Sequence, residues 1–328
     1  MAGQQREFTK LDKVLSNFEK RNQVMGSIAF SESGVPVYSR ALGFSQISTQ
    51  TKADTLTKYR IGSVSKMLTA TMILQLVAEG KLALSDKLSR FFPNWPNASK
   101  IAIEHLLRHE SGIFNFGKSN EKKYQNINPQ SRAEIIAVFE NAPIAFAPGK
   151  KVDYNNANYV VLSLVVEEID KTSYAESLHA RINKPLSLKN THAGGLIDAS
   201  QNEANSYFWK KKWLKNNDLY SPSLLGAGAL VSTPNDLNVF INALFNHKIL
   251  PEAQLQEMLN LKDGMGLGIY IFPFYDKTAY GHSGNIDSFE SLSAYFPEEN
   301  IAFTICLNGN RKDFNEVLIA CMRAYLEI

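Results

Sequence analysis

Several features that often reveal a protein's function are scarce in this 328-residue chain. Two cysteines, Cys306 and Cys321, are too few for a disulfide framework, and their apolar surroundings favour buried free thiols. The longest apolar run, residues 159–166, is interrupted by Ser163 and is too short to span a bilayer. The N-terminal residues lack the apolar segment of a signal peptide, so we expect either a cytoplasmic protein or an exported one without its leader.

An excess of one charge is also lacking. The chain has 35 Lys and Arg against 32 Asp and Glu, a formal net charge of +3. This balance argues against nucleic acid or an anionic membrane as the partner. There is no glycine-rich phosphate loop of the nucleotide-binding kinds. The hydrophobic fraction of 44% is typical of a globular protein whose core can hold a buried site.

The order of helical and strand patterns predicts an α+β fold. Helical spacing over residues 7–22 precedes a hairpin pattern at 24–43, and the C-terminal part contains four short β-rich runs before a final helix. Helical segments joined by Pro, Asn and Gly loops lie between them. We therefore expect an antiparallel sheet flanked by the N- and C-terminal helices and built from residues 1–60 and 225–328. Residues 61–224 would form a mainly helical inserted domain, with the active site in the cleft between the two.

A serine and a lysine one helical turn apart are the first candidates for chemistry. Residues 64–79 form a strong helical pattern, closed by Gly80. Ser63 at its start has free backbone N–H groups beside it, and Lys66 falls on the same face. A lysine whose pKa has fallen from about 10.4 can take the serine proton. The alternative is that Ser63 only caps the helix.

A second polar segment precedes the helix predicted over residues 157–170. Tyr154 could move a proton there, with its pKa lowered by a nearby charged Lys66. Asn156 could donate its amide to a substrate carbonyl. Under the alternative interpretation, Asn155 or Asn156 simply caps the helix.

The third segment, Gly281-His282-Ser283-Gly284, has strand character. Alternation places His282 and Ser283 on opposite faces, and Gly284 allows close approach of a ligand to the backbone. A backbone N–H after Gly284 could form an oxyanion hole together with that of Ser63. The alternative is a tight turn with a surface histidine.

In this order the three motifs resemble those of serine hydrolases of the class C β-lactamase and penicillin-binding DD-peptidase type. The flanks are similar to that family as well, as in IGSVSKMLTATMILQLVAEGKLALSDKLSRFFP, FAPGKKVDYNNANYVVLSLVVEEI and GHSGNIDSFESLSAYFPEENIAFTICLN. The resemblance covers most of residues 55–310. It implies a β-lactamase/transpeptidase-like fold and an acyl-enzyme mechanism with no metal or cofactor. It also favours a periplasmic or exported protein over a cytoplasmic one.

The resemblance implies a role for each site residue. Ser63 would be the acylated nucleophile, Lys66 its general base, and Tyr154 would share the proton transfer and protonate the leaving group. The residues implied to bind substrate are Asn156, His282, Ser283, Gly284 and Asn285. The backbone N–H groups of Ser63 and Asn285 would form the oxyanion hole.

The third motif departs from the β-lactamase pattern, because His282 stands where those enzymes have the lysine of Lys-Thr-Gly. That lysine supplies a fixed positive charge for a substrate carboxylate, whereas histidine has an ordinary pKa of about 6.5. We therefore expect no efficient β-lactamase. If His282 binds a carboxylate, kcat/KM should fall at about pH 6–7 as it loses its proton. Asp287, in a stretch that is usually glycine-rich, is expected to narrow or charge the cleft.

Two other clusters allow alternative interpretations. His105 and His109 have the i,i+4 spacing of zinc ligands, but no third ligand is evident, so packing or surface roles are favoured. The segment from Trp209 to Trp213, with Lys215, could contact an anionic polymer or a headgroup layer. A solvated loop with aromatic anchors is the favoured interpretation.

These observations predict a metal-free serine hydrolase whose substrate is a small molecule or peptide. The favoured activity is that of a D-amino-acid peptidase or a DD-carboxypeptidase-like enzyme, with penicillin binding as a further capacity. One alternative is a carboxylesterase on the same scaffold. The other is a weakly catalytic sensor that binds peptidoglycan fragments or β-lactams. The substrate would be a D-amino-acid peptide, an ester or a β-lactam.

Overall fold

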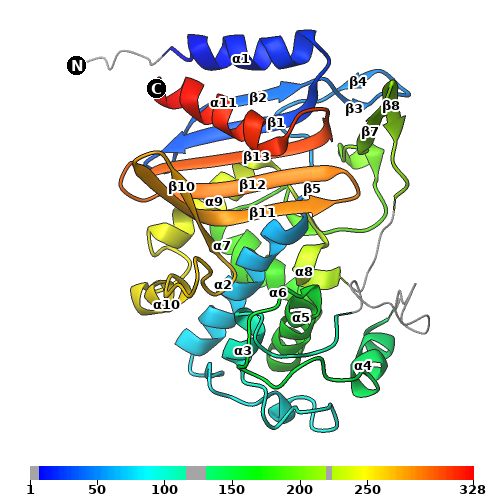
Figure 1. Cartoon of the computed structure of the whole chain (residues 1–328), viewed down its shortest axis with the longest axis vertical. Coiled ribbons are helices and arrows are strands. Elements are labelled where there is room, and N and C mark those ends of the chain that lie inside the picture. Colours follow the sequence, from blue (N-terminus) through cyan, green and yellow to red (C-terminus); the bar gives the residue numbers. More distant parts are fainter. Residues whose placement is uncertain (1–6, 116–130, 219–223) are drawn as a thin grey trace.

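The two ends of the chain form one large antiparallel sheet (Figure 1). The computed structural model describes residues 7–115, 131–218 and 224–328. The sheet follows the order β10-β11-β12-β13-β1-β2. The strands along this path are β1 (Val24–Glu32), β2 (Val35–Leu42), β10 (Tyr270–Phe274), β11 (Lys277–Ile286), β12 (Phe289–Phe296) and β13 (Ile301–Asn310), and a short hairpin described below joins the sheet at β13. β1 pairs with β13, so the first and last strands in the sequence are neighbours in the sheet.

The two terminal helices pack side by side against one face of this sheet (Figure 1). They are α1 (Thr9–Lys20) and α11 (Phe314–Leu326). Leu11, Leu15 and Phe18 of α1 recur at helical spacing and are buried, which gives this helix its apolar stripe. Tyr325 of α11 stacks on Phe30 of β1, with ring centroids 3.8 Å apart. The predicted helix pair is therefore present and closes a core of its own.

The opposite side of the sheet faces α9 (Pro234–Phe245), which contacts β1, β12 and β13. Thr233 caps this helix, since its side chain accepts a hydrogen bond from the backbone N–H of Asp236, and Pro234 occupies the first turn. Below the sheet in Figure 1 lies the helical part of the molecule. Two of its helices, α2 (Ser65–Ala78) and α5 (Asn156–Asp170), are buried on nearly every side. The shorter helices are α3 (Ile103–Leu107), α4 (Arg132–Glu140), α6 (Tyr174–Leu178), α7 (Lys184–Leu186), α8 (Leu225–Gly228) and α10 (Glu252–Met258).

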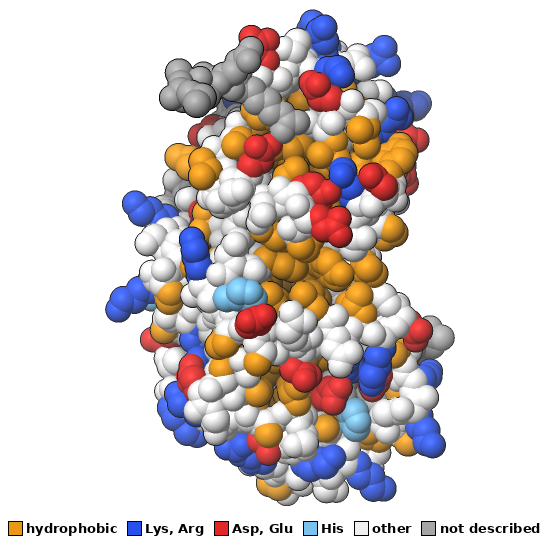
Figure 2. Space-filling model, turned by 90° about the vertical axis from the view of Figure 1, so that its left-hand side faces the viewer, with side chains coloured by type: hydrophobic (Ala, Val, Ile, Leu, Met, Phe, Trp, Pro, Cys, Tyr) orange, Lys and Arg blue, Asp and Glu red, His pale blue; other side chains and the backbone are white. Residues whose placement is uncertain are grey.

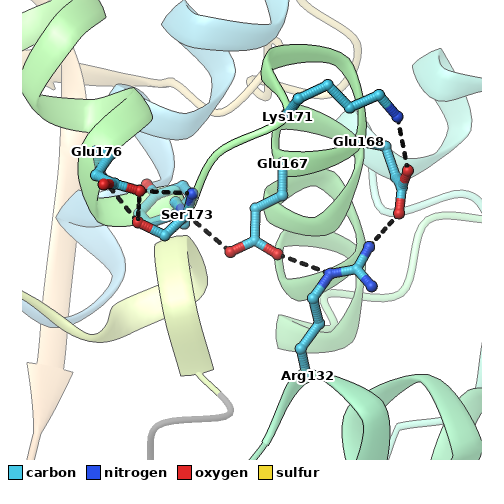
Figure 3. Close-up of polar contacts among 7 residues, drawn as sticks. Arg132, Glu167, Glu168, Lys171, Ser173 and Glu176 are labelled. Carbon is cyan, nitrogen blue, oxygen red and sulfur yellow. Dashed lines mark hydrogen bonds and ion pairs between the residues drawn. The ribbon is translucent and has the colours of Figure 1, made fainter.

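An ionic network fastens α4 and α6 to α5 (Figure 3). The guanidinium of Arg132 in α4 contacts both Glu167, at 3.1 Å, and Glu168 of α5. The other carboxylate oxygen of Glu167 accepts a hydrogen bond from the backbone N–H of Tyr174. Ser173 and Glu176 form a capping box that begins α6. These contacts fix the helix whose first turn carries Asn156.

Several short strands were not predicted. They are β3 (Phe44–Gln46), β4 (Thr51–Lys52), β5 (Tyr59–Arg60), β6 (His192–Ala193), β7 (Tyr207–Lys210), β8 (Lys212–Lys215) and β9 (Leu230–Ser232). The segment from Trp209 to Trp213 is thus a hairpin rather than a loop. Its tryptophans are nevertheless anchors, because Arg311 lies 3.6 Å from the Trp209 ring centroid and Trp213 donates to Asn22 at 2.8 Å. Its lysines are exposed.

The predicted α+β architecture is confirmed, whereas the domain boundaries at residues 60/61 and 224/225 stay a prediction. Cys306 and Cys321 are buried free thiols, as expected. Within the described ranges, no helix is long and apolar enough to cross a membrane. On the face shown in Figure 2, acidic and basic side chains are interspersed, in keeping with the small formal net charge.

Candidate active site

Ser63 lies at the junction of the sheet and the helical part. It belongs to a single 3₁₀ turn, Gly62–Val64, which follows β5 and leads directly into α2. Gly62 has φ +50°, a left-handed conformation that glycine adopts at little cost. Ser63 therefore precedes the α-helix instead of being its first residue. One turn later, the Nζ atom of Lys66 lies 2.9 Å from the Oγ atom of Ser63.

Lys66 is completely buried, and its amine contacts three hydrogen-bond acceptors. Besides Ser63 Oγ, the Nζ atom donates to the Oδ1 atom of Asn156 at 2.8 Å and to the carbonyl of Ala227 at 2.5 Å. Burial disfavours the charged form and lowers the pKa of Lys66 to about 7. The amine is therefore neutral in a large fraction of molecules near physiological pH.

The three partners of Lys66 are not equivalent. The amide oxygen of Asn156 and the carbonyl oxygen of Ala227 can only accept hydrogen bonds, whereas the Ser63 hydroxyl can also donate one. A neutral amine has two N–H groups and one lone pair. When both N–H groups serve the two obligate acceptors, the lone pair faces the hydroxyl of Ser63. The local geometry thus points the lone pair of Lys66 at the Ser63 hydroxyl.

Tyr154 approaches Ser63 from the other side. Its hydroxyl donates a hydrogen bond to Ser63 Oγ at 2.8 Å. The expectation that a charged Lys66 lowers the pKa of Tyr154 is wrong, because burial raises that pKa above its ordinary value. Lys66 contacts the ring face, with Nζ 5.0 Å from the centroid. Tyr154 is consequently a protonated hydrogen-bond donor in the resting site.

The two neighbouring asparagines have separate tasks. Asn155 caps α5, since its side chain accepts a hydrogen bond from the backbone N–H of Ala157 at 2.9 Å. This leaves the Asn156 side chain exposed, with its Oδ1 atom on Lys66. That Asn156 also binds a substrate carbonyl stays a prediction.

The turn that carries Ser63 touches β11 through two glycines. A methyl group on Gly284 would lie 2.1 Å from the carbonyl oxygen of Ile61 and 3.0 Å from the backbone nitrogen of Ser63. A methyl group on Gly62 would likewise lie 3.0 Å from the backbone nitrogen of Asn285. The close approach therefore requires glycine on both sides. It brings together the two N–H groups that were predicted to form an oxyanion hole.

His282 does not behave as the sequence led us to expect. Its side chain is buried, and burial together with the charge of Lys66 lowers the pKa of His282 to about 3. Its Nδ1 atom contacts the carbonyl oxygen of Ser283 at 2.5 Å, so Nδ1 carries the proton and Nε2 is an acceptor. A titration of His282 at about pH 6–7, and a charge for a substrate carboxylate, are therefore wrong. Ser283 and Asn285 are exposed, on the other face of the strand.

Sequence reasoning missed three contributors. The Ala227 carbonyl reaches Lys66 because α8 packs tightly: a methyl group on Gly226 would lie 2.1 Å from Thr69 Oγ1. The Gly-Ala-Gly run at 226–228 is the signal that could have indicated this close packing. Tyr270 packs edge-on against His282, with centroids 4.8 Å apart, and His109 lies 4.5 Å from the ring of Tyr154.

The histidine pair has no common ligand geometry. The helix α3 ends at Leu107, and His109 has φ +58°, so His109 leaves the helical face on which His105 lies. The Nδ1 atom of His105 accepts from the backbone of Ala102, and that of His109 accepts from the backbone of Asn155. The described part of the chain contains no group of three or more His, Cys, Asp or Glu residues able to hold a metal ion.

Comparison with protein families agrees with this geometry. A family model described as Beta-lactamase matches residues 11–320. The chain belongs to the β-lactamase family. It is a serine hydrolase with the fold of that family, as the motifs predicted.

Individual relatives and structures are distant in sequence but similar over nearly the whole chain. A Staphylococcus aureus protein named teichoic acid D-alanine hydrolase is 26% identical over 323 residues, which cover 95% of this chain and 76% of that protein. D-amino acid amidase from Ochrobactrum anthropi SV3 has a TM-score of 0.86 at 22% identity, covering 98% of this chain and 99% of the amidase. A penicillin-binding protein from Bacillus halodurans has a TM-score of 0.80 at 23% identity, with 97% and 99% coverage. These structures share the fold.

Proposed function

We propose that this chain hydrolyses amide or ester bonds of D-aminoacyl substrates through an acyl-enzyme on Ser63. The observation that carries the proposal is the Lys66 amine, which is buried, has a pKa lowered to about 7 and lies 2.9 Å from the Ser63 hydroxyl. A base with a pKa near the working pH is half deprotonated there and still accepts a proton readily. The same contact supports Ser63 as the nucleophile and Lys66 as its general base.

The reaction can be followed atom by atom. Ser63 Oγ forms a bond to the substrate carbonyl carbon while its proton passes to Lys66. The backbone N–H groups of Ser63 and Asn285 receive the negative charge that develops on the carbonyl oxygen. Tyr154 gives its proton to the leaving amine or alcohol as the carbon–heteroatom bond breaks, and Lys66 returns the proton to Tyr154. Water then attacks the acyl carbon by the same proton path in reverse. The bond between that carbon and Ser63 Oγ breaks, the water's proton reaches Oγ through Tyr154 and Lys66, and the carboxylic acid departs.

The D-aminoacyl part of the proposal is supported by the relatives. The S. aureus relative is named for D-alanine, and the O. anthropi amidase for D-amino acids. An enzyme that shares their family or fold and presents an activated serine is suited to such acyl groups. The exposed side chain of Asn156 beside the nucleophile is the amide that we propose for binding the acyl group.

The leaving group that we propose carries no carboxylate. His282 replaces the lysine of β-lactamases, but it is neutral and its Nε2 atom is buried. The residue therefore offers no positive charge to a substrate carboxylate. We therefore favour D-amino-acid amides, esters and amino-terminal peptide bonds over D-Ala-D-Ala carboxypeptidase substrates and β-lactams.

A substrate panel with intact-mass detection of the acyl-enzyme tests this proposal. D-alaninamide and a D-alanyl ester should acylate the protein, with L-alaninamide as the stereochemical control. A D-Ala-D-Ala peptide and a cephalosporin should react much more slowly. Ser63→Ala should abolish the covalent adduct, and peptide mapping should place it on Ser63 rather than Ser65 or Ser283. A preference for the carboxylate-bearing compounds would refute the leaving-group assignment.

A further inference from the structure

A buried arginine lies three residues before the nucleophile. Arg60 ends β5, and only 6% of its side chain is exposed. Its Nη1 atom lies 2.8 Å from the Oδ2 atom of Asp287, while Nη2 pairs with Asp218 and donates to the carbonyl of Gly195 at 2.7 Å. A charge so far removed from water is costly unless it is paired and hydrogen-bonded. Arg60 therefore binds three segments that are distant in sequence.

One of these segments is the turn after β11. Asp287 follows Asn285 by two residues, and Asp287 and Ser288 both have positive φ angles, of 47° and 65°. This conformation is costly for residues other than glycine, although aspartate tolerates it better than most. The backbone carbonyl of Asp287 also accepts a hydrogen bond from Ser206. The turn thus has a backbone conformation that its own residues disfavour. The ion pair with Arg60 is one of the contacts that stabilise this conformation.

Arg60 also lies directly before the turn that carries Ser63, so this turn is the other segment that the ion pair connects. The carbonyl of Ile61, directly after Arg60, accepts a hydrogen bond from Ser291 Oγ of β12 at 2.8 Å. The β11–β12 hairpin therefore contacts the Ser63 segment through the Arg60–Asp287 ion pair and through the Ile61–Ser291 hydrogen bond. In the strand register, Asn285 lies between Asp287 and Gly284, which pairs with Ser291, and Ser63 follows Ile61 by two residues.

We propose that Arg60 and Asp287 are positioning residues that set the spacing of the oxyanion hole. The ion pair fixes Asn285 on β11 relative to Ser63, so its loss would leave both donors present but misplaced. This inference rests on the proposed function, because it requires Ser63 and Asn285 to stabilise a tetrahedral oxyanion. It also gives Asp287, which the sequence only predicted to narrow or charge the cleft, a defined partner.

Asp218 provides a matched control within the same cluster. It binds the same guanidinium, but its other oxygen accepts a hydrogen bond from the backbone N–H of Ile197 at 2.6 Å, away from β11. Asp218→Asn and Asp287→Asn remove the same charge from the same arginine. Only Asp287→Asn weakens the connection to Asn285.

The experiment compares these variants by ester kinetics and by affinity for an alkyl boronic acid, which forms a tetrahedral adduct with an active-site serine. Asp287→Asn should lower kcat by roughly 10-fold, less than the ~10²–10³ for complete loss of an oxyanion donor. It should weaken boronate binding by the same factor. KM should change little, because the N–H groups of the oxyanion hole bind the carbonyl of a ground-state ester less strongly than a tetrahedral adduct. Asp218→Asn should change kcat and boronate affinity far less.

Arg60→Lys keeps the charge but loses the planar fork. It serves as a second variant if Asp287→Asn does not fold, and it should reproduce the parallel loss of kcat and boronate affinity. Unchanged boronate affinity in both variants, or equal losses in Asp218→Asn and Asp287→Asn, would overturn the positioning role. Failure of the wild-type protein to bind boronate through Ser63 would instead refute the proposed function itself.

Discussion

The Nζ atom of Lys66 lies 2.9 Å from the Oγ atom of Ser63, and no water-exposed surface of the lysine remains. The one-turn spacing of Ser63 and Lys66 places the amine beside the hydroxyl, and burial lowers the pKa of that amine to about 7. Under the proposed mechanism, the pH dependence of acylation therefore reports on the protonation state of Lys66.

We predict that kcat/KM for a neutral ester rises with pH through about 7 and then levels off. Acylation requires the neutral amine, so activity increases as Lys66 loses its proton. Asn156→Asp should move this rise to higher pH, since a carboxylate in place of the Oδ1 acceptor at 2.8 Å favours the ammonium form. Initial rates between pH 5 and 10 check both expectations. A profile that stays in place in Asn156→Asp would exclude Lys66 as the titrating base.

Tyr154→Phe removes the hydroxyl that donates to Ser63 at 2.8 Å. We expect the acylation rate for an amide to fall by about 10²–10⁴-fold, the usual contribution of a positioned acid–base group. An ester with a nitrophenolate leaving group should lose much less, because that group departs without a proton. Lys66→Met should impair both substrates. Combining the two changes should not multiply the losses, since both act on one proton path.

Much of this site could be predicted from the sequence, because its parts are local. Ser63 and Lys66 lie one turn apart, Tyr154 and Asn156 belong to one short segment, and Gly284 is the glycine that a close backbone contact needs. Each pattern depends only on residues near one another in the chain. The family resemblance then supplied their order.

The features that could not be predicted depend on tertiary burial. The Ala227 carbonyl has no residue-type signature, since every residue has one. The pKa of His282 is set by the residues that bury it. Arg60 and Asp287 are separated by 227 positions in the chain, so no local pattern connects them. The hairpin β7–β8 has the sequences YFWK and KWLK, and its strand character becomes evident only against β13 and Asn22.

His282 provides a third prediction. A lysine introduced by His282→Lys would place a second positive charge near Lys66, whose charge already acts on His282. Like charges disfavour each other, so the pKa of Lys66 should fall and the rise in kcat/KM should move to lower pH. The matched variant His282→Gln keeps the site neutral and should leave the profile near pH 7. Equal profiles for the two variants would mean that position 282 does not influence the base.

The last prediction concerns the contact between β11 and the turn of Ser63. Gly284→Ala would place a methyl group 2.1 Å from the Ile61 carbonyl oxygen, a backbone atom that can move only with its whole segment. The strand must therefore separate from the turn, which withdraws the Asn285 N–H from Ser63. Acylation by an ester should fall by up to about 10²–10³-fold, the cost of losing one oxyanion donor. The pH at which activity rises should not change, because the two obligate acceptors of Lys66, Asn156 and Ala227, lie outside this contact.

Gly195→Ala is the control, because a methyl group there meets no atom within 4 Å and leaves in place the backbone carbonyl that accepts from Arg60. It should retain near wild-type rates. Thermal melting of both variants separates a local displacement from unfolding. A Gly284→Ala protein that melts normally and acylates at the wild-type rate would show that this backbone contact does not contribute to the oxyanion hole.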